Sequence, residues 1–181
     1  IFNQMANSDN AVALWNEVLK TDTDRYEQED ILMNFVTNHD ENSWNGTARE
    51  RMGNAAELLT ALSFLAPGMP LIYSGQEYDL NHRLLFFEKD QIPHTKKLMW
   101  PLLEKLGQLK NSSPALNGGK NAATYKKINQ ENTDIKINRI IVRIDKRYFR
   151  PLEVDFLKGN SKKARKNRLE NLYSRIKKLK K

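Results

Sequence analysis

The sequence has no cysteine among its 181 residues. Disulfide bonds and thiolate metal sites are therefore excluded, and cysteine content gives no indication of the redox compartment. Long apolar runs are also missing and 29% of the residues are charged, so we predict no membrane-spanning helix. No G-x-G-x-x-G pattern follows a predicted strand, and we expect no nucleotide cofactor. The three histidines, His39, His82 and His94, lack zinc-ligand spacing, and we predict no metal site.

Positive charge is abundant but unevenly distributed. The net charge is +8, yet residues 1–132 hold 13 basic and 17 acidic groups, whereas residues 133–181 hold 17 basic and 5 acidic groups. A charge step of this size predicts two pieces of the chain with different partners or origins. The sequence indicates neither a compartment nor an oligomeric state. It opens on Ile1 with no export signal, which we interpret as the start of an internal fragment.

The apolar pattern predicts alternating strands and helices. Helical spacing covers residues 10–19, 48–65 and 96–109, with Pro101 as a kink or first-turn residue. Short apolar runs predict strands at 31–37, 71–75, 121–128 and 140–144, and polar composition predicts loops at 21–30 and 41–47. The order strand, loop, helix, repeated once, is typical of an α/β barrel or a doubly wound sheet. Both folds place their chemistry at the carboxyl ends of the strands.

His39 and Asp40 follow the first of these strands directly. Asx residues are common after strands, so periodicity alone favours a turn in which His39 satisfies backbone groups and Asp40 begins the turn. The alternative is a polar pocket that binds a sugar, because an aromatic ring can stack on a sugar face while carboxylates and amides pair with its hydroxyls. The candidates for such a pocket are Glu41, Asn42, Trp44, Tyr73, Gln76, Glu77 and His82.

Two segments about thirty residues apart carry a more specific signal: "FVTNHDENSWNGT" and "PGMPLIYSGQE". Together they resemble the alpha-amylase family, glycoside hydrolase family 13, at the ends of the seventh and eighth barrel strands. The likeness continues through "NHRLLFFEKDQI" and "LGQLKNSSPALNGGKNAATYKKI" and covers residues 1–130. It implies an α/β fold, namely the last two strand–helix units of a (β/α)8 TIM barrel, here followed by a basic, largely helical tail.

The resemblance also implies an activity and residue roles. Family members cleave α-glucosidic bonds with retention, using a nucleophile, a general acid/base and a third carboxylate. Asp40 matches the third carboxylate, which stabilises the transition state, while His39 and Asn38 match sugar-binding positions. The other two carboxylates belong to the fourth and fifth strands, which this sequence does not match. We therefore expect an α-glucan or maltooligosaccharide as partner, and no hydrolysis by this chain alone.

The tail carries a second resemblance. "VRIDKRYFRPLEVDFLKGNSKKARK", residues 142–166, is similar to the C-terminal part of GDP-mannose 4,6-dehydratase, a nucleotide-sugar lyase. That likeness implies that Arg150 and Glu153 contact a nucleotide-sugar. The alternative, which we favour for so short a match, is a solvated turn with a surface ion pair.

The two resemblances meet near "NQENTDIKI", where the charge also changes. We interpret the chain as a chimera: a truncated barrel segment at 1–116, the start of a C-terminal β domain at 117–132, and a basic tail at 133–181 with an amphipathic helix. Two further interpretations stay open, a dehydratase remnant and a non-enzymatic chain that binds anions or is inert. Lysine-rich helices bind phosphate backbones, but no motif here predicts a specific nucleic-acid partner.

Overall fold

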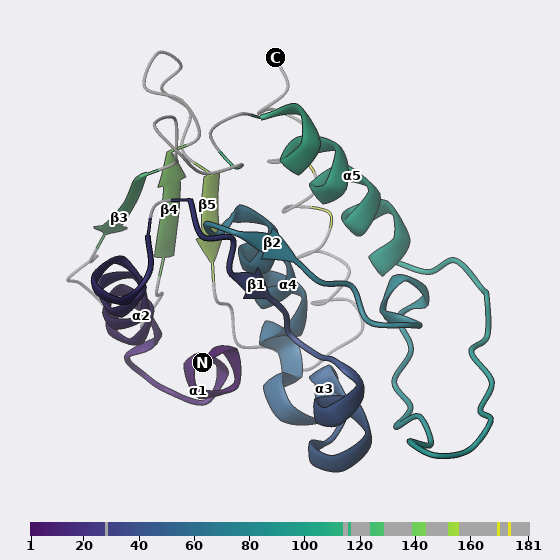
Figure 1. Ribbon diagram of the computed structural model, residues 1–181. Coiled ribbons are helices and arrows are strands. Elements are labelled where there is room, and N and C mark those ends of the chain that lie inside the picture. Colours follow the sequence, from purple (N-terminus) through teal and green to yellow (C-terminus); the bar gives the residue numbers. More distant parts are fainter. Residues whose placement is uncertain are drawn as a thin grey trace.

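The computed structural model describes residues 1–27, 29–113, 116, 124–128, 139–143, 152–155, 170 and 174 (Figure 1). Its helices are α1 (Phe2–Ala6), α2 (Ala11–Arg25), α3 (Ala48–Met52), α4 (Ala56–Leu65) and α5 (Met99–Ser112). Its strands are β1 (Met33–Asn34), β2 (Met69–Pro70), β3 (Thr124–Ile128), β4 (Arg139–Arg143) and β5 (Leu152–Asp155). Three short helical turns complete the set: the π-helical η1 (Glu41–Asn45) and the 3-10 turns η2 (Gly53–Ala55) and η3 (Gln76–Tyr78).

Strands β1 and β2 pair in parallel, and the chain between them includes α3 and α4. Met33 lies opposite Met69 and Asn34 lies opposite Pro70. We predicted the second strand at 71–75, which is wrong, because the pairing is over by Leu71. The ladder tolerates Pro70, which has no N–H, because the donors are its neighbours: Met69 N donates to Leu32 O at 2.8 Å and Leu71 N to Asn34 O at 2.8 Å.

Gly68 allows this close approach. Its φ is +98°, a value that residues with a Cβ rarely adopt, and a Cβ built there would lie 2.0 Å from Leu32 O. The preceding helix α4 ends just before Pro67, with Ala66 already extended. The "APGMP" segment therefore ends a helix and starts a strand within four residues.

Two helix predictions need correction. Residues 21–25, predicted as loop, continue α2, where Thr23 Oγ1 donates to Leu19 O at 2.8 Å within the helix. The single helix predicted at 48–65 is broken at Gly53, whose φ of +52° separates α3 from η2 and α4. The third predicted helix is confirmed, with α5 beginning at Met99 and Pro101 in its first turn, where a missing N–H costs nothing.

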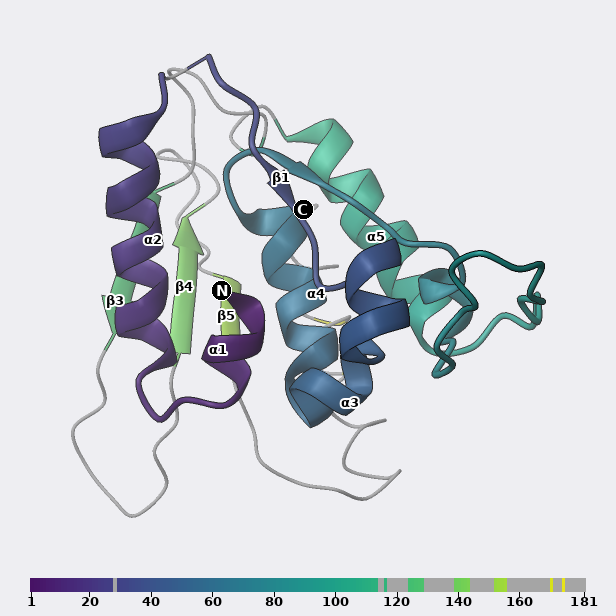
Figure 2. The same ribbon diagram turned by 60° about the horizontal axis from the view of Figure 1, so that its bottom comes forward.

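Helix α4 lies at the centre of the described structure. All ten of its residues are buried, and it lies beside β2 and between the α1–α2 pair and α5 in both views (Figures 1 and 2). Its two hydroxyl groups bond within the helix: Thr60 Oγ1 donates to Ala56 O at 2.8 Å and Ser63 Oγ to Thr60 O at 2.7 Å. Its buried carboxylate, Glu57, pairs with Arg49 of α3. Apolar side chains from all five helices form one core, in which Phe2 and Trp15 stack with ring centroids 6.1 Å apart.

Lys110 is a cation inside this core. It is 7% exposed, and its Nζ donates to Ala66 O, the carbonyl that ends α4, at 3.1 Å. Burial lowers the pKa of the Lys110 ammonium to about 8. The bond caps the helix with a positive charge, the sign that a helix C-terminus favours.

Strands β3, β4 and β5 form a separate antiparallel sheet in that order. Strand β3 precedes the boundary expected at residue 132, and β4 and β5 follow it, so this sheet joins both sides. Glu153 lies in β5 rather than in the solvated turn that we favoured. The predicted tail helix lies outside the described residues except for Glu170 and Ser174, which are helical. No helix in the described part of the chain is long and apolar enough to cross a membrane.

The described residues thus contain an α/β unit with one parallel strand pair. The α/β class predicted from the sequence agrees with this arrangement, whereas a closed barrel is not part of what the described residues form.

Candidate functional site

The predicted site lies where the chain leaves β1. Residues Phe35 to Asn38 lead from the strand into a helical segment that starts at His39 and becomes the π-helical turn η1. We predicted a loop at 41–47, which is wrong for residues 41–45. Asn38 explains the helical start, because its Oδ1 accepts from Glu41 N at 2.8 Å and its carbonyl accepts from Asn42 N at 2.9 Å. The side-chain oxygen of this predicted sugar-binding residue is thus occupied by a cap.

His39 and Asp40 are held apart from the core. Their side chains are 64% and 61% exposed, and His39 Nε2 lies 3.6 Å from Asp40 Oδ2. An imidazole and a carboxylate at this spacing can both reach the hydroxyl groups of one ligand. The turn predicted from periodicity is present at Asp40, which precedes η1, but Asn38 and not His39 makes the capping bonds to the backbone. The exposure of both side chains leaves the sugar-binding interpretation open.

Arg51 of α3 joins the two ends of this segment. Its Nη2 donates to Val36 O at 2.7 Å, its Nε to Gly46 O at 3.0 Å, and its Nη1 lies 3.1 Å from Glu41 Oε2. The side chain is 9% exposed, and burial lowers the pKa of the guanidinium, an effect that Glu41 opposes. One buried arginine therefore fixes the backbone before and after His39 and Asp40. Sequence analysis did not identify it.

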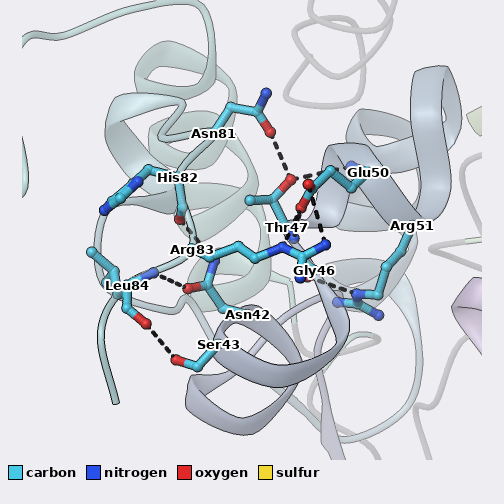
Figure 3. Close-up of polar contacts among 10 residues, drawn as sticks. All are labelled: Asn42, Ser43, Gly46, Thr47, Glu50, Arg51, Asn81, His82, Arg83 and Leu84. Carbon is cyan, nitrogen blue, oxygen red and sulfur yellow. Dashed lines mark hydrogen bonds and ion pairs between the residues drawn. The ribbon is translucent and has the colours of Figure 1, made fainter. Parts of the chain in front are cut away.

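A second set of contacts holds the loop after β2 against η1 and α3. We call it the clamp; it comprises Asn42, Ser43, Thr47 and Glu50 on one side and Asn81, His82, Arg83 and Leu84 on the other (Figure 3). Asn42 is 5% exposed and makes two of the bonds: its Nδ2 donates to His82 O at 3.1 Å, and its Oδ1 accepts from Leu84 N at 2.7 Å. Ser43 Oγ donates to Leu84 O at 2.7 Å. Two adjacent side chains thus satisfy the polar backbone of a loop forty residues away.

The other half of the clamp is built on the N-terminus of α3. Thr47 and Glu50 form a capping box, in which Glu50 N donates to Thr47 Oγ1 at 3.1 Å and Thr47 N to Glu50 Oε2 at 2.7 Å. The same Oε2 accepts from Arg83 Nε at 2.9 Å, and Thr47 Oγ1 donates to Asn81 Oδ1 at 2.6 Å. The Arg83 hydrogen bond, with help from the Thr47 backbone, lowers the pKa of Glu50 to about 2.

His82 takes part in this loop in two ways. Its carbonyl belongs to the clamp, while its ring Nε2 lies 2.9 Å from Asp90 Oδ2. Asp90 also accepts from the backbone N–H groups of Leu85 and Gln91 at 3.0 and 2.7 Å. These backbone bonds, followed by His82, lower the pKa of Asp90. His82 therefore closes the loop on itself through Asp90.

The remaining residues of the predicted pocket are not gathered around His39 and Asp40. Gln76 accepts from Tyr73 N at 3.2 Å and donates through Nε2 to Thr60 Oγ1 of α4 at 3.3 Å, so it faces the interior. Burial raises the pKa of the Tyr73 phenol. Tyr73, Gln76 and Asn42 line a small cavity of about 50 Å³ to which neither His39 nor Asp40 contributes. Trp44 is linked to the exposed pair through Phe86, whose ring lies near both Trp44 and His39. Glu41 follows Asp40 directly in the chain.

Two residues that sequence analysis missed lie next to Trp44. Phe86 and Phe87 project from the clamped loop, with the Phe86 ring centroid 5.2 Å from that of Trp44 and 5.7 Å from that of His39. The available signal was the apolar run "LLFF" inside an otherwise polar stretch, for which a loop gives no packing reason.

The structure gives no support for a metal site in its described part, and it does not place the side chains of the predicted tail residues, Arg150 and Glu153. Among the described residues, no three His, Cys, Asp or Glu side chains gather to hold a metal ion. Arg150 lies outside the described residues, and for Glu153 the structure describes the backbone alone. Their assignment to a nucleotide-sugar stays a prediction.

Comparison with known proteins gives the context of this fold. No family model and no curated protein sequence matches the chain. Solved structures do match, among them an alpha-amylase from Lactobacillus plantarum, with 23% identity, a TM-score of 0.60, and coverage of 78% of this chain and 32% of that one. A noncanonic maltogenic alpha-amylase, AmyB, from Thermotoga neapolitana matches with 20% identity, a TM-score of 0.59 and the same coverage, 78% and 32%.

At these identities the likeness concerns the fold alone. The chain spans about a third of the length of the solved structures that it matches. Its fold is similar to part of an alpha-amylase structure, in agreement with the first resemblance drawn from the sequence. None of the comparisons supports the resemblance of residues 142–166 to GDP-mannose 4,6-dehydratase.

Proposed function

We propose that this chain supplies the last two strand–helix units of an alpha-amylase-type barrel and binds an α-glucan at His39 and Asp40. The observation that carries the proposal is the exposed pair at the carboxyl end of β1, with side chains 64% and 61% exposed and 3.6 Å apart. Ligand sites of parallel α/β folds lie at this end of the strands. Similarity of fold to alpha-amylases and the "NHD" match support the same assignment.

In this proposal the Asp40 carboxylate stabilises the positive charge of the transition state. Cleavage of a glycosidic bond passes through an oxocarbenium-like transition state, and a nearby carboxylate stabilises the positive charge as it develops. His39 holds a sugar hydroxyl in a bond that strengthens in that state, which lowers the barrier selectively. Asn38 starts the turn that aims both side chains, because its Oδ1 accepts from Glu41 N at 2.8 Å. Arg51 holds that turn in place.

The nucleophile and the general acid/base of such a reaction have no counterpart among the motifs of this sequence. We therefore propose that the chain binds maltooligosaccharides without hydrolysing them, unless a further polypeptide completes the site. One stabilising carboxylate is not enough, because retaining cleavage needs two further carboxyl groups in defined positions.

The test is titration calorimetry of the 181-residue chain with maltoheptaose, combined with an assay for reducing sugar. We expect binding without release of reducing ends. Asp40→Asn and His39→Gln should each weaken binding, whereas Glu29→Gln, an exposed change outside the site, should not. The absence of maltoheptaose binding, or equal binding by all variants, would contradict the proposal. Starch hydrolysis by the purified chain would overturn its inactive part.

A further inference from the structure

Three aromatic side chains form an exposed cluster on the side of the candidate site. We call Trp44, Phe86 and Phe87 the aromatic cluster; their residues are 58%, 38% and 85% exposed. Ring centroids lie 5.2 Å apart for Trp44 and Phe86, 4.7 Å for Phe86 and Phe87, and 6.2 Å for Trp44 and Phe87. These spacings place the rings in mutual contact while each still faces solvent.

The cluster does not serve the core. Phe87 is the most exposed large apolar residue among those that the structure describes, and a phenylalanine that gains nothing from burial contributes little to folding. The cluster is nevertheless held firmly, because the residue two positions before Phe86 is fixed by the clamp: Leu84 is bonded to Asn42 at its N–H and to Ser43 at its carbonyl. The hydrogen bonds of Leu84 to Asn42 and Ser43 thus hold the loop so that the rings of Phe86 and Phe87 stay at the surface.

The cluster is continuous with the proposed glucan site. The His39 ring centroid lies 5.7 Å from that of Phe86, and His39 in turn lies beside Asp40. A ligand at this place meets flat apolar rings on one side and hydrogen-bonding groups at their edge. A pyranose has that pattern, with C–H groups on its faces and hydroxyls around its rim.

The surroundings of the cluster argue against a protein partner. A specific protein–protein interface buries about 1,200 Å² or more in total, with an apolar centre of many residues. Here the exposed apolar area comprises the three rings and the adjacent Leu85, which is 53% exposed. Asn45, Glu88 and Lys89, all exposed, border it in sequence. The cluster has the size of a sugar-stacking surface.

We propose that Trp44, Phe86 and Phe87 form a stacking surface for a second pyranose ring of the same α-glucan, next to the ring that His39 and Asp40 hold. This inference rests on the proposed function and extends it from one sugar to at least two. It assigns the loop after β2 a role in ligand length, and it makes Asn42 a positioning residue, because Asn42 fixes that loop without touching the ligand.

The experiment measures maltoheptaose and maltose affinity of the full chain by titration calorimetry. Phe87→Ala and Trp44→Ala should each weaken maltoheptaose binding about tenfold, the effect of losing roughly 50 Å² of apolar contact. Phe87→Tyr should keep the affinity, because it retains the ring. Tyr26→Ala is the matched control: Tyr26 is an exposed aromatic residue that directly follows α2, and its loss should change nothing. Helix α2 lies on the side of α4 away from α5 (Figure 1).

The outcomes separate this inference from the proposed function. If Asp40→Asn weakens binding and the cluster variants do not, the stacking surface is wrong and the glucan site stands. If the cluster variants weaken binding and Asp40→Asn does not, the stacking surface stands and the role of Asp40 falls. No maltoheptaose binding at any concentration, or equal effects of Phe87→Ala and Tyr26→Ala, overturns the inference. So does a cluster that drives self-association in sedimentation experiments while sugar affinity is unchanged.

Discussion

Asp40 and Asn42 are two residues apart at the start of the same helical segment, yet their surroundings are opposite. The Asp40 side chain is 61% exposed and has His39 at 3.6 Å, whereas Asn42 is 5% exposed and makes two hydrogen bonds to a distant loop. The same contrast holds between the aromatic cluster, which faces solvent, and the Asn42–Leu84 part of the clamp, which is buried. The groups around Asn42 that fix the shape are buried and paired, and those that we assign to ligand binding are exposed.

The largest effect that tests this contrast is expected at Asn42. In Asn42→Ala, the Leu84 N–H and the His82 carbonyl lose their partners in a buried setting, at a cost of about 2–3 kcal/mol in the free energy of unfolding. Urea denaturation followed by circular dichroism measures the change. We also expect faster proteolysis of residues 81–90, since the loop is released.

Asn45→Ala is the matched control for that variant. Asn45 is an exposed amide in the same turn whose contact with Glu41 measures 3.4 Å, so its removal should cost less than about 0.5 kcal/mol. Equal destabilisation by the two variants would mean that the clamp is no stronger than a surface contact.

Lys110 extends the contrast to a buried charge, and its test is the dependence of stability on pH. Burial lowers its pKa from 10.5 to about 8, so between pH 8 and 10.5 the unfolded chain binds more protons than the folded one. Stability therefore rises with pH in this window. Relative to Lys110→Met, which has no such group, the wild-type chain should gain about 1–2 kcal/mol between pH 8 and 10.5, after allowance for solvent screening. Guanidinium denaturation at a series of pH values measures the free energy of unfolding of both proteins. If it changes with pH in parallel for the two, the Lys110 ammonium is not desolvated.

Glu50 offers a smaller test, on the acid side. Its pKa is lowered to about 2 by Arg83 first, so it contributes stability above its ordinary value of 4.5, and this contribution is lost as the pH falls toward 2. The melting temperature of the wild-type chain should therefore fall more steeply between pH 4.5 and 2 than that of Glu50→Gln. Glu88→Gln, an exposed change in the loop that contains Arg83, should follow the wild-type curve.

The smallest effect on the free energy of unfolding is expected for variants of the aromatic cluster. Trp44→Ala and Phe87→Ala remove side chains that are more exposed than buried, so each should change the free energy of unfolding by less than about 1 kcal/mol. The comparison predicts a crossover: Asn42→Ala lowers stability, and the cluster variants lower glucan affinity at almost constant stability. A cluster variant that unfolds the chain would place the rings in the fold and not in ligand binding.

The sequence was informative where local pattern decides the structure. It predicted the helix that begins at Met99, the α/β class and the position of His39 and Asp40 after the first strand, because apolar spacing and a terminal Asx residue are local signals. It placed the second strand too late, since the partner of Pro70 is set by pairing with β1. It also missed the break at Gly53, because a positive φ has no periodic signature.

The clamp and Arg51 could not have been predicted in the same way. Asn42 and Leu84, or Arg51 and Val36, are brought together by the tertiary structure, and no spacing in the sequence indicates that they meet. Phe86 and Phe87 left a signal, an apolar pair in a polar stretch, but its meaning depends on where the clamp aims the loop. Local pattern thus predicted the order of strands and helices but not the strand ends, and the tertiary contacts decide what is presented after each strand.

The two extreme tryptophans give the molecule its own optical reporters. Trp15 is 3% exposed in the core and Trp44 is 58% exposed in the aromatic cluster. An indole surrounded by apolar side chains emits at shorter wavelength than one in water. In a Trp100→Phe background, which removes the third, half-buried tryptophan, the native fluorescence spectrum should therefore contain a shielded and an exposed component. Iodide should quench the Trp44 component selectively, and the Trp15 component should shift to the red only when the core opens. Unfolding and events at the cluster can therefore be followed separately in one unlabelled sample.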